Sequence, residues 1–444
     1  MKVLKFHPSG YILYPGQIKA WRRFYQFVFS RDERVLFIEA PKGGGKTWLL
    51  LFVHWLATHS GPPIEGELPC QKQRDQSPRD KQNQKDQCDE RDPITDLAYE
   101  LNEHHLPKKK ALLIGCESWE EEIVPVHQPY VLAKDRVLTV EEIRSEIANL
   151  LIQNWDLKGV PSPQSADEQA TFLHALRSRL NGISSPHISL LLVDAPESLD
   201  ERTRHELETL ILAPYADAPG GKILIALRQG ARPAWRHWAL QEAERVFLPG
   251  VKDPDRFWHQ KYEGVQPPVN FLDILKARWT VVSAEEDLGL PPLLLDLLHR
   301  CEMRDLGGEV DASNEEHLWA CLRQEWLLHT FRHYLLEERG EKFIQISRGS
   351  DIFRIPITIW EDLLRSLIQS YYENIQSSQG FDAWDWEVDE TVQSRIHKEP
   401  PSLLLDRWVV YSFLQREGLM LFARGEWWFD PSLRLLFKKY ADGA

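Results

Sequence analysis

One stretch of sequence decides the fold of this chain: Val35-Leu-Phe-Ile-Glu-Ala-Pro-Lys-Gly-Gly-Gly-Lys46-Thr47. It begins with an apolar run typical of a buried strand, passes through a glycine cluster and continues into an apolar helix at Thr47–Thr58. Glycines let successive backbone N–H groups turn toward one anion, and the N-terminus of the helix adds partial positive charge. Strand, loop and helix in this order predict a phosphate-binding loop.

The loop matches the pattern G-x-x-x-x-G-K-[ST], except that Ala40 stands at the first position. Alanine is small and fits there if its φ stays negative. In this pattern Lys46 reaches the β- and γ-phosphates and the Thr47 hydroxyl binds Mg²⁺. A glycine-rich turn before an unrelated helix is disfavoured because both the strand and the helix are present. The residues expected to contact the nucleotide here are Pro41, Lys42, Gly43, Gly44, Gly45, Lys46, Thr47 and Trp48.

A second apolar strand, Ile188–Val193, runs into Asp194. A carboxylate at the end of such a strand is expected to hold the hydration shell of Mg²⁺, so Thr47 and Asp194 form the predicted metal site. Position 195 is alanine, where a catalytic glutamate commonly stands. Glu197 then has two open roles: it orients the attacking water, or it stabilises the N-terminus of the next helix.

A third apolar strand, Lys222–Leu227, ends at Arg228. An arginine at this place can present its guanidinium to a γ-phosphate, as a nucleotide sensor does. Arginine at a strand end is more often part of a surface ion pair. The position after the phosphate loop and Asp194 favours the sensor. The predicted catalytic residues are therefore Lys46, Asp194, Glu197 and Arg228.

The composition of the chain excludes several classes of protein. The 444 residues carry a formal charge of −14 and are 43% hydrophobic, as in a soluble globular chain of several domains. No apolar run has the roughly 18 residues of a membrane span, and no secretory signal begins the chain. The five cysteines are scattered, which disfavours disulfides and zinc. We expect a cytoplasmic protein without a membrane partner.

Strands alternating with helices predict an α/β fold with a P-loop parallel sheet in the strand order 5-1-4-3-2. The strands, numbered along the chain, are 35–38, 111–115, 188–193, 222–227 and 245–248. The expected domains are a P-loop domain at 1–61 and 111–252, a disordered polar insertion at 62–110, a helical lid at 253–310, a helical region at 311–400 and a winged-helix-like domain at 401–444.

These motifs together resemble the STAND group of P-loop ATPases, the NB-ARC and NACHT switches, among the AAA+ relatives. Tyr14-Pro-Gly16-Gln17 is similar to the segment that packs near the adenine, which implies nucleotide contacts for Gly16 and Gln17. Gly289-Leu-Pro291-Pro-Leu293 is similar to the lid motif whose proline contacts the nucleotide. Glu197 lies where NACHT proteins carry their second acid. The C-terminal helix, two strands and helix look like half of a winged helix.

The resemblance implies a molecular switch that is closed with ADP and open with ATP and Mg²⁺. It implies slow ATP hydrolysis, nucleotide-dependent self-assembly and signal transduction to a separate effector or signalling protein, in regulation or defence. One departure concerns the histidine that the family's winged helix often offers to the β-phosphate. Phe429-Asp430-Pro431 occupies that place here, and no histidine follows His397.

Two other functions compete with the switch. An AAA+ ATPase of the origin-recognition or transposition-regulator type would bind DNA through its winged helix. The candidate helix Asp406–Glu417 offers only Arg407 and Arg416 as basic residues, so its charge favours a packing module over a DNA reader. A kinase-like enzyme would need a substrate pocket, for which the sequence shows no motif.

Overall fold

The fold is taken from a computed structural model of the chain. The structure describes residues 4–6, 11–13, 17–30, 32–58, 111–116, 130–131, 163–181, 189–199, 201–231, 233–262, 265–283, 289–305, 315–348, 350–376, 386–423 and 426–438, with single positions between 141 and 160. The predicted insertion at 62–110 lies outside them. The chain divides into two compact units. The first comprises 1–40, 45–227 and 233–250, and the second comprises 41–44, 228–232 and 251–444.

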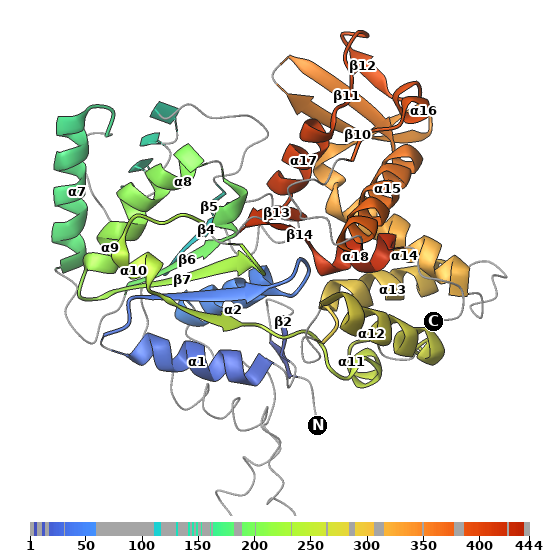
Figure 1. Ribbon diagram of the computed structural model, residues 1–444. Coiled ribbons are helices and arrows are strands. Elements are labelled where there is room, and N and C mark those ends of the chain that lie inside the picture. The colour runs from blue at the N-terminus through green and yellow to red at the C-terminus, as the bar shows by residue number, and fades with distance from the viewer. Residues whose placement is uncertain are drawn as a thin grey trace, which may run out of the picture. The chain divides into compact units, whose positions relative to one another are not determined.

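The first unit is built on a six-stranded sheet with the order β5-β4-β6-β7-β3-β8 (Figure 1). Its five longer strands are parallel and follow the predicted order, so the predicted α/β class is confirmed. The short β5 adds an edge strand that was not expected. The bounds are β3 Val35–Ala40, β4 Ala111–Gly115, β5 Tyr130–Val131, β6 Ser189–Asp194, β7 Gly221–Arg228 and β8 Glu244–Phe247.

The central strands are buried on both faces, which explains their unbroken apolar sequences. Every residue of β3, β6 and β7 is buried. Successive side chains of a strand point to opposite faces. Leu36 and Ile38 accordingly join one hydrophobic cluster, and Phe37 joins the other. The sheet therefore lies between two helical layers, each of which covers one apolar face.

Helices from different parts of the chain cover the two faces (Figure 1). One cluster includes Trp21 and Phe52, from α1 (Ile18–Phe29) and α2 (Lys46–Thr58). The other includes side chains of α7, α8, a π-helical turn and α9. Their bounds are α7 Ala166–Asn181, α8 Glu201–Leu207, the turn Glu208–Leu212 and α9 Ala213–Asp217. A further short helix, α10 (Trp238–Gln241), precedes β8.

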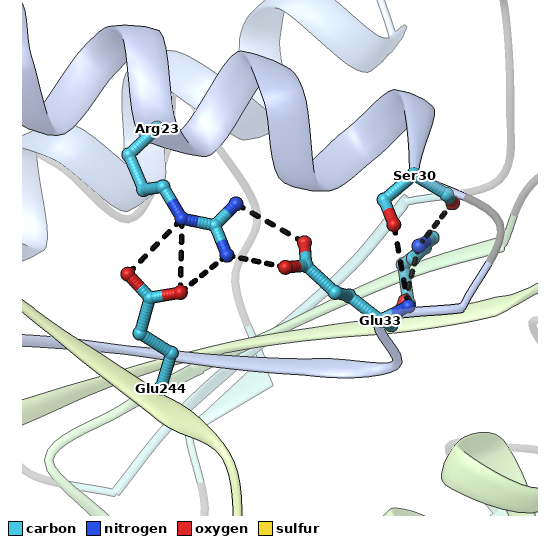
Figure 2. Close-up of polar contacts among 5 residues, drawn as sticks. Arg23, Ser30, Glu33 and Glu244 are labelled. Carbon is cyan, nitrogen blue, oxygen red and sulfur yellow. Dashed lines mark hydrogen bonds and ion pairs between the residues drawn. The ribbon is translucent and has the colours of Figure 1, made fainter.

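An arginine joins α1 to the edge of the sheet (Figure 2). The Arg23 Nε donates to both carboxylate oxygens of Glu244 on β8, at 3.0 and 3.1 Å. The Arg23 Nη1 donates to Glu33, in the loop before β3, at 3.1 Å. These partners raise the pKa of Arg23. A planar guanidinium can bind two carboxylates at once, so one side chain fixes helix, loop and strand.

The second unit is mainly helical. Its helices are α11 Pro254–Lys261, α12 Val269–Ser283, α13 Pro292–Asp305, α14 Glu315–Thr330, α15 Ile357–Gln376, α16 Glu390–Gln393, α17 Arg407–Arg416 and α18 Pro431–Phe437. Aromatic rings join three of them. The Phe331 ring, just after α14, lies 5.5 Å from Trp360 of α15 and 5.5 Å from Phe413 of α17. Such rings bury large areas and favour edge-to-face or offset packing.

The prediction that residues 311–400 are helical is wrong in part. They contain a four-stranded antiparallel sheet with the order β12-β11-β10-β9. The strands are β9 Leu335–Glu338, β10 Glu341–Arg348, β11 Asp351–Pro356 and β12 His397–Glu399. A two-residue turn joins β9 to β10, with φ of 54° at Arg339 and 83° at Gly340. Positive φ at both positions is the type I′ geometry that closes hairpins, and it reverses the chain within the region that was expected to be helical.

The C-terminal elements occur in the predicted sequence of helix, strand, strand and helix. After α17, β13 (Met420–Ala423) pairs antiparallel with β14 (Glu426–Phe429), and α18 follows. Aspartates begin both helices. The Asp406 carboxylate accepts from Val409 N at 2.9 Å, and that of Asp430 accepts from Ser432 N at 2.8 Å. Side-chain caps of this kind satisfy N–H groups that the first helical turn leaves unpaired.

Strands β1 (Leu4–Phe6) and β2 (Tyr11–Leu13) form a small antiparallel pair that was not expected. Among the helices that the structure describes, none has both the length and the apolar character required to cross a membrane.

Lys222 is a buried cation at the start of β7. Its Nζ donates to the carbonyl oxygen of Ser30 at 2.6 Å and also to that of Glu33. The ring of Phe27 lies 4.9 Å from the same nitrogen. Burial, together with the charge of Arg34, lowers the pKa of Lys222 to about 8 from its ordinary value of 10.5. Burial disfavours the charged amine more than the nearby acids favour it.

We predict that the free energy of unfolding of the wild type rises, relative to Lys222→Met, between about pH 8 and pH 10. In this interval the unfolded chain keeps the proton that the folded chain has lost, so folding becomes more favourable as pH increases. The difference should grow by at most about 1.4 kcal/mol per pH unit. Urea titrations at several pH values measure it, with exposed Lys276→Met as the control. A difference that stays constant or shrinks with pH contradicts the assignment.

Candidate functional site

The glycine-rich loop joins β3 to α2 and has the conformation its glycines allow. Gly43 has a φ of 74° and Gly45 a φ of 84°, values that residues with a side chain rarely adopt. Gly44 N donates to Pro41 O at 3.0 Å, and Leu49 N donates to Gly45 O at 3.0 Å. The loop therefore closes a tight turn directly before the first turn of the helix. Backbone N–H groups in such a turn form a concave site for an anion.

Lys46 begins helix α2 and is 8% exposed. Its Nζ donates to the carbonyl oxygen of Ala40, the last residue of β3, at 3.0 Å. The ammonium group therefore folds back along the loop instead of extending into water. A charge held in this position is ready to attract a phosphate.

A hydrogen bond between Thr47 and Asp194 joins two of the predicted motifs. The Thr47 Oγ1 donates to Asp194 Oδ2 at 2.6 Å. Asp194 ends β6 and is fully buried, and strand β7 lies between β6 and β3. The two side chains meet because parallel strands end at the same edge of the sheet. Both residues belong to the first unit.

The Thr47 hydroxyl and the Asp194 carboxylate can bind a metal ion that needs few ligands from the protein. The described residues include no group of three or more histidine, cysteine, aspartate or glutamate side chains that could hold a metal ion. Mg²⁺ usually keeps several waters and binds through one or two carboxylates together with substrate phosphates. A hydroxyl and a buried carboxylate beside an anion-binding loop fit this requirement.

Glu197 follows Asp194 through an unusual backbone conformation. Ala195 is left-handed, with a φ of 53°, and its N–H donates to Ala226 O at 3.0 Å. Glu197 then lies half-buried in a short 3₁₀ turn, Pro196–Ser198, and α8 begins later, at Glu201. Left-handed conformations of residues other than glycine cost energy and are common at functional sites. Both roles predicted for Glu197 stay predictions.

Arg228 ends β7 and is 2% exposed. A Cβ atom placed on Gly418 would lie 1.5 Å from Arg228 Nη1, so the guanidinium lies directly against this glycine. Gly418 has a φ of 60°, and it follows α17. Both residues belong to the second unit. The expected sensor therefore has a defined packing partner, and its contact with a γ-phosphate stays a prediction.

Two segments that carry the family resemblance each contain a residue near a different glycine of the glycine-rich loop. Gln17, before α1, is 1% exposed, and its Nε2 would lie 3.7 Å from a Cβ on Gly45. Gly16 lies outside the described residues. Pro291 stands directly before α13, where Leu293 N donates to Gly43 O at 3.3 Å. Gln17 and the lid motif therefore each lie near one of the two left-handed glycines.

Asp430, which the family resemblance puts in the place of the histidine that contacts the β-phosphate, makes a contact with the loop that was not predicted. Its Oδ2 accepts from the backbone N–H of Lys42 at 3.0 Å, within the second unit, and its side chain is fully buried. The sequence pattern Asp-Pro-Ser signals a helix cap, which Asp430 also provides through its Oδ1. Nothing local in the sequence signals the contact with Lys42.

Comparisons with known proteins do not add a function. No family model and no curated protein matches the chain. Among solved structures, a chain of the E. coli MS115-1 HORMA:CdnC:Trip13 complex matches with a TM-score of 0.25 and 10% sequence identity. The match covers 63% of this chain and 86% of that one. A similarity this low supports no argument about fold or activity.

We predict that Thr47→Val lowers the free energy of unfolding by about 1–3 kcal/mol without any ligand, because the buried Asp194 carboxylate loses a donor. Denaturant titration measures the change. The control is Thr171→Val on α7, an exposed threonine whose hydroxyl donates to Asp167 O at 2.9 Å, and it should change stability by less than about 0.5 kcal/mol. Equal stability of Thr47→Val and the wild type would contradict the described contact.

Proposed function

We propose that this chain binds a nucleoside triphosphate, ATP by family resemblance, at the loop that precedes α2. The single observation that carries the proposal is the 2.6 Å hydrogen bond from Thr47 to Asp194 beside a loop with two left-handed glycines. A structural turn would not require a buried carboxylate opposite the first turn of the helix. A phosphate loop requires both groups.

Each residue then has a defined task. The loop amides and the N-terminus of α2 bind the phosphates, and Lys46 moves from Ala40 O to a phosphate oxygen. Thr47 and Asp194 hold Mg²⁺, which, when bound, neutralises charge on the β- and γ-phosphates. Glu197, three residues after Asp194, orients the attacking water. Arg228 stabilises the negative charge of the γ-phosphate.

We further propose that hydrolysis is slow and that the nucleotide works as a switch. The support is the resemblance to STAND ATPases, with residues 253–310 as a helical lid that carries the motif at 289–293, and the C-terminal helix, hairpin and helix as a winged-helix module. A nucleotide can shift a conformational equilibrium only through contacts that differ between two states. The buried Arg228 is a candidate for such a contact. The output passes to a separate effector protein, or to further copies of this chain.

We predict that Mg²⁺-ATP raises the melting temperature of the wild type and leaves that of Lys46→Ala unchanged. A ligand that binds only the native state stabilises it by mass action, about 2.7 kcal/mol at a concentration of 100 times Kd. Differential scanning calorimetry with and without ATP measures this. The exposed Lys276→Ala, on α12, is the matched control and should retain the full shift. An equal shift of the melting temperature in Lys46→Ala would contradict the assignment of a phosphate-binding loop.

We also predict that the wild type assembles into larger particles with Mg²⁺-ATP than with Mg²⁺-ADP, and that duplex DNA does not accelerate its ATPase rate. Light scattering after size-exclusion chromatography gives the mass, and phosphate release with and without DNA gives the rate. A DNA-stimulated rate would favour an AAA+ ATPase acting on DNA. Equal mass with both nucleotides would contradict an assembly switch.

A further inference from the structure

The fully buried carboxylate of Asp430 holds a backbone donor of the glycine-rich loop. Its Oδ2 accepts from the N–H of Lys42 at 3.0 Å, and its Oδ1 accepts from Ser432 N at 2.8 Å. Both oxygens therefore accept hydrogen bonds, as those of a carboxylate anion do. Lys42 and Asp430 belong to the same unit of the structure. The residue that caps α18 thus also brings a negative charge to the loop.

The C-terminal elements fix this contact on both sides. Asp430 N donates to Leu419 O at 2.9 Å, which joins the two ends of the β13–β14 hairpin. The Lys42 Nζ donates to Glu417 O, just after α17, at 3.5 Å. The Glu417 carboxylate accepts in turn from the hydroxyl of Tyr334 at 2.6 Å. The backbone and the side chain of Lys42 therefore both bond to the segments that flank the hairpin.

A carboxylate in this position opposes a phosphate in two ways. A backbone N–H group is a single donor, so the one that bonds to Asp430 is taken up by an anion of the protein itself. Two negative charges also repel each other, and they do so more strongly away from bulk water. The resemblance to STAND ATPases places at this position a histidine that contacts the β-phosphate. Asp430 has the opposite charge character, so its effect on a bound phosphate is expected to be opposite.

We infer that Asp430 is an intramolecular competitor of the nucleotide phosphates, which lowers the affinity of the loop for nucleotide as long as the carboxylate bonds to Lys42. This inference rests on the proposed function, because it concerns the same loop. It assigns a regulatory role to the contact: a partner that draws Asp430 away from Lys42 raises the affinity for nucleotide. The chain by itself then binds nucleotide more weakly than its phosphate loop allows.

The test replaces Asp430 by residues that keep the cap of α18 and lose the charge. Asparagine caps helices as well as aspartate does, but it has one acceptor oxygen, which cannot serve both Ser432 and Lys42. Isothermal titration calorimetry measures Kd for Mg²⁺-ATP. We expect Asp430→Asn to bind about 10-fold more tightly than the wild type, because the bond between Lys42 and a charged group no longer has to be broken. Asp430→Ser, also a capping residue, should show the same gain.

The matched control is Asp406→Asn. Asp406 is exposed and caps α17, where its carboxylate accepts from Val409 N at 2.9 Å, so this variant makes the same substitution at a helix cap of the same unit. It should leave Kd unchanged. A second control adds Lys46→Ala to Asp430→Asn and should abolish the gain, because the gain depends on phosphate binding by the loop. Melting curves without ligand show whether each variant is folded.

The outcomes separate the inference from the proposed function. If Asp430→Asn and Asp430→Ser bind Mg²⁺-ATP no more tightly than the wild type, or if the gain survives Lys46→Ala, the inference is wrong. Binding by the wild type that Lys46→Ala abolishes would then still support the phosphate loop. If neither the wild type nor the Asp430 variants bind Mg²⁺-ATP, the proposed function is wrong and the inference falls with it. Tighter binding that Lys46→Ala abolishes supports both.

Discussion

The hydrogen bond between Thr47 and Asp194 is the constraint on which the site depends. It joins the first turn of α2 to the end of β6, although β7 separates β6 from the strand that leads into the loop. The contact forms because the three strands are parallel, so that Asp194 and the loop after β3 lie at the same edge of the sheet. The buried apolar runs of these strands are what hold that alignment. The geometry of the site is therefore a consequence of how the sheet is packed, and not of the loop alone.

Much of the first unit could be predicted from the sequence, because its signals are local. The strands β3, β6 and β7 are continuous apolar runs, and such runs are typical of central strands in a parallel sheet. Glycines followed by lysine and threonine predicted the loop and the start of α2. Asp194 was recognisable because it directly follows an apolar run. Each of these features is encoded within about ten consecutive residues.

Of three features that escaped prediction, the first is a local turn and the other two depend on distant residues. The pairing of β9 with β10 needs the left-handed Arg339, a residue type that rarely signals a turn. Asp430 meets Lys42 across 388 positions of sequence, and its local pattern announces only a helix cap. The packing of Arg228 on Gly418 likewise joins segments far apart in the chain. No short-range pattern carries such information, so sequence reasoning left these contacts undetermined.

The arrangement around Arg23 also affects how the chain behaves beside its own copies. Strand β8 ends the described sheet, and the open edge of a sheet can recruit a strand from a neighbouring molecule and start aggregation. Here two charged residues stand next to each other on that edge, Glu244 held by Arg23 and Arg245 paired with Glu39. Charged side chains on an edge strand discourage such recruitment. The ion pair that fastens α1 to Glu244 thus also places charge on the edge where a strand of a neighbouring molecule would have to pair.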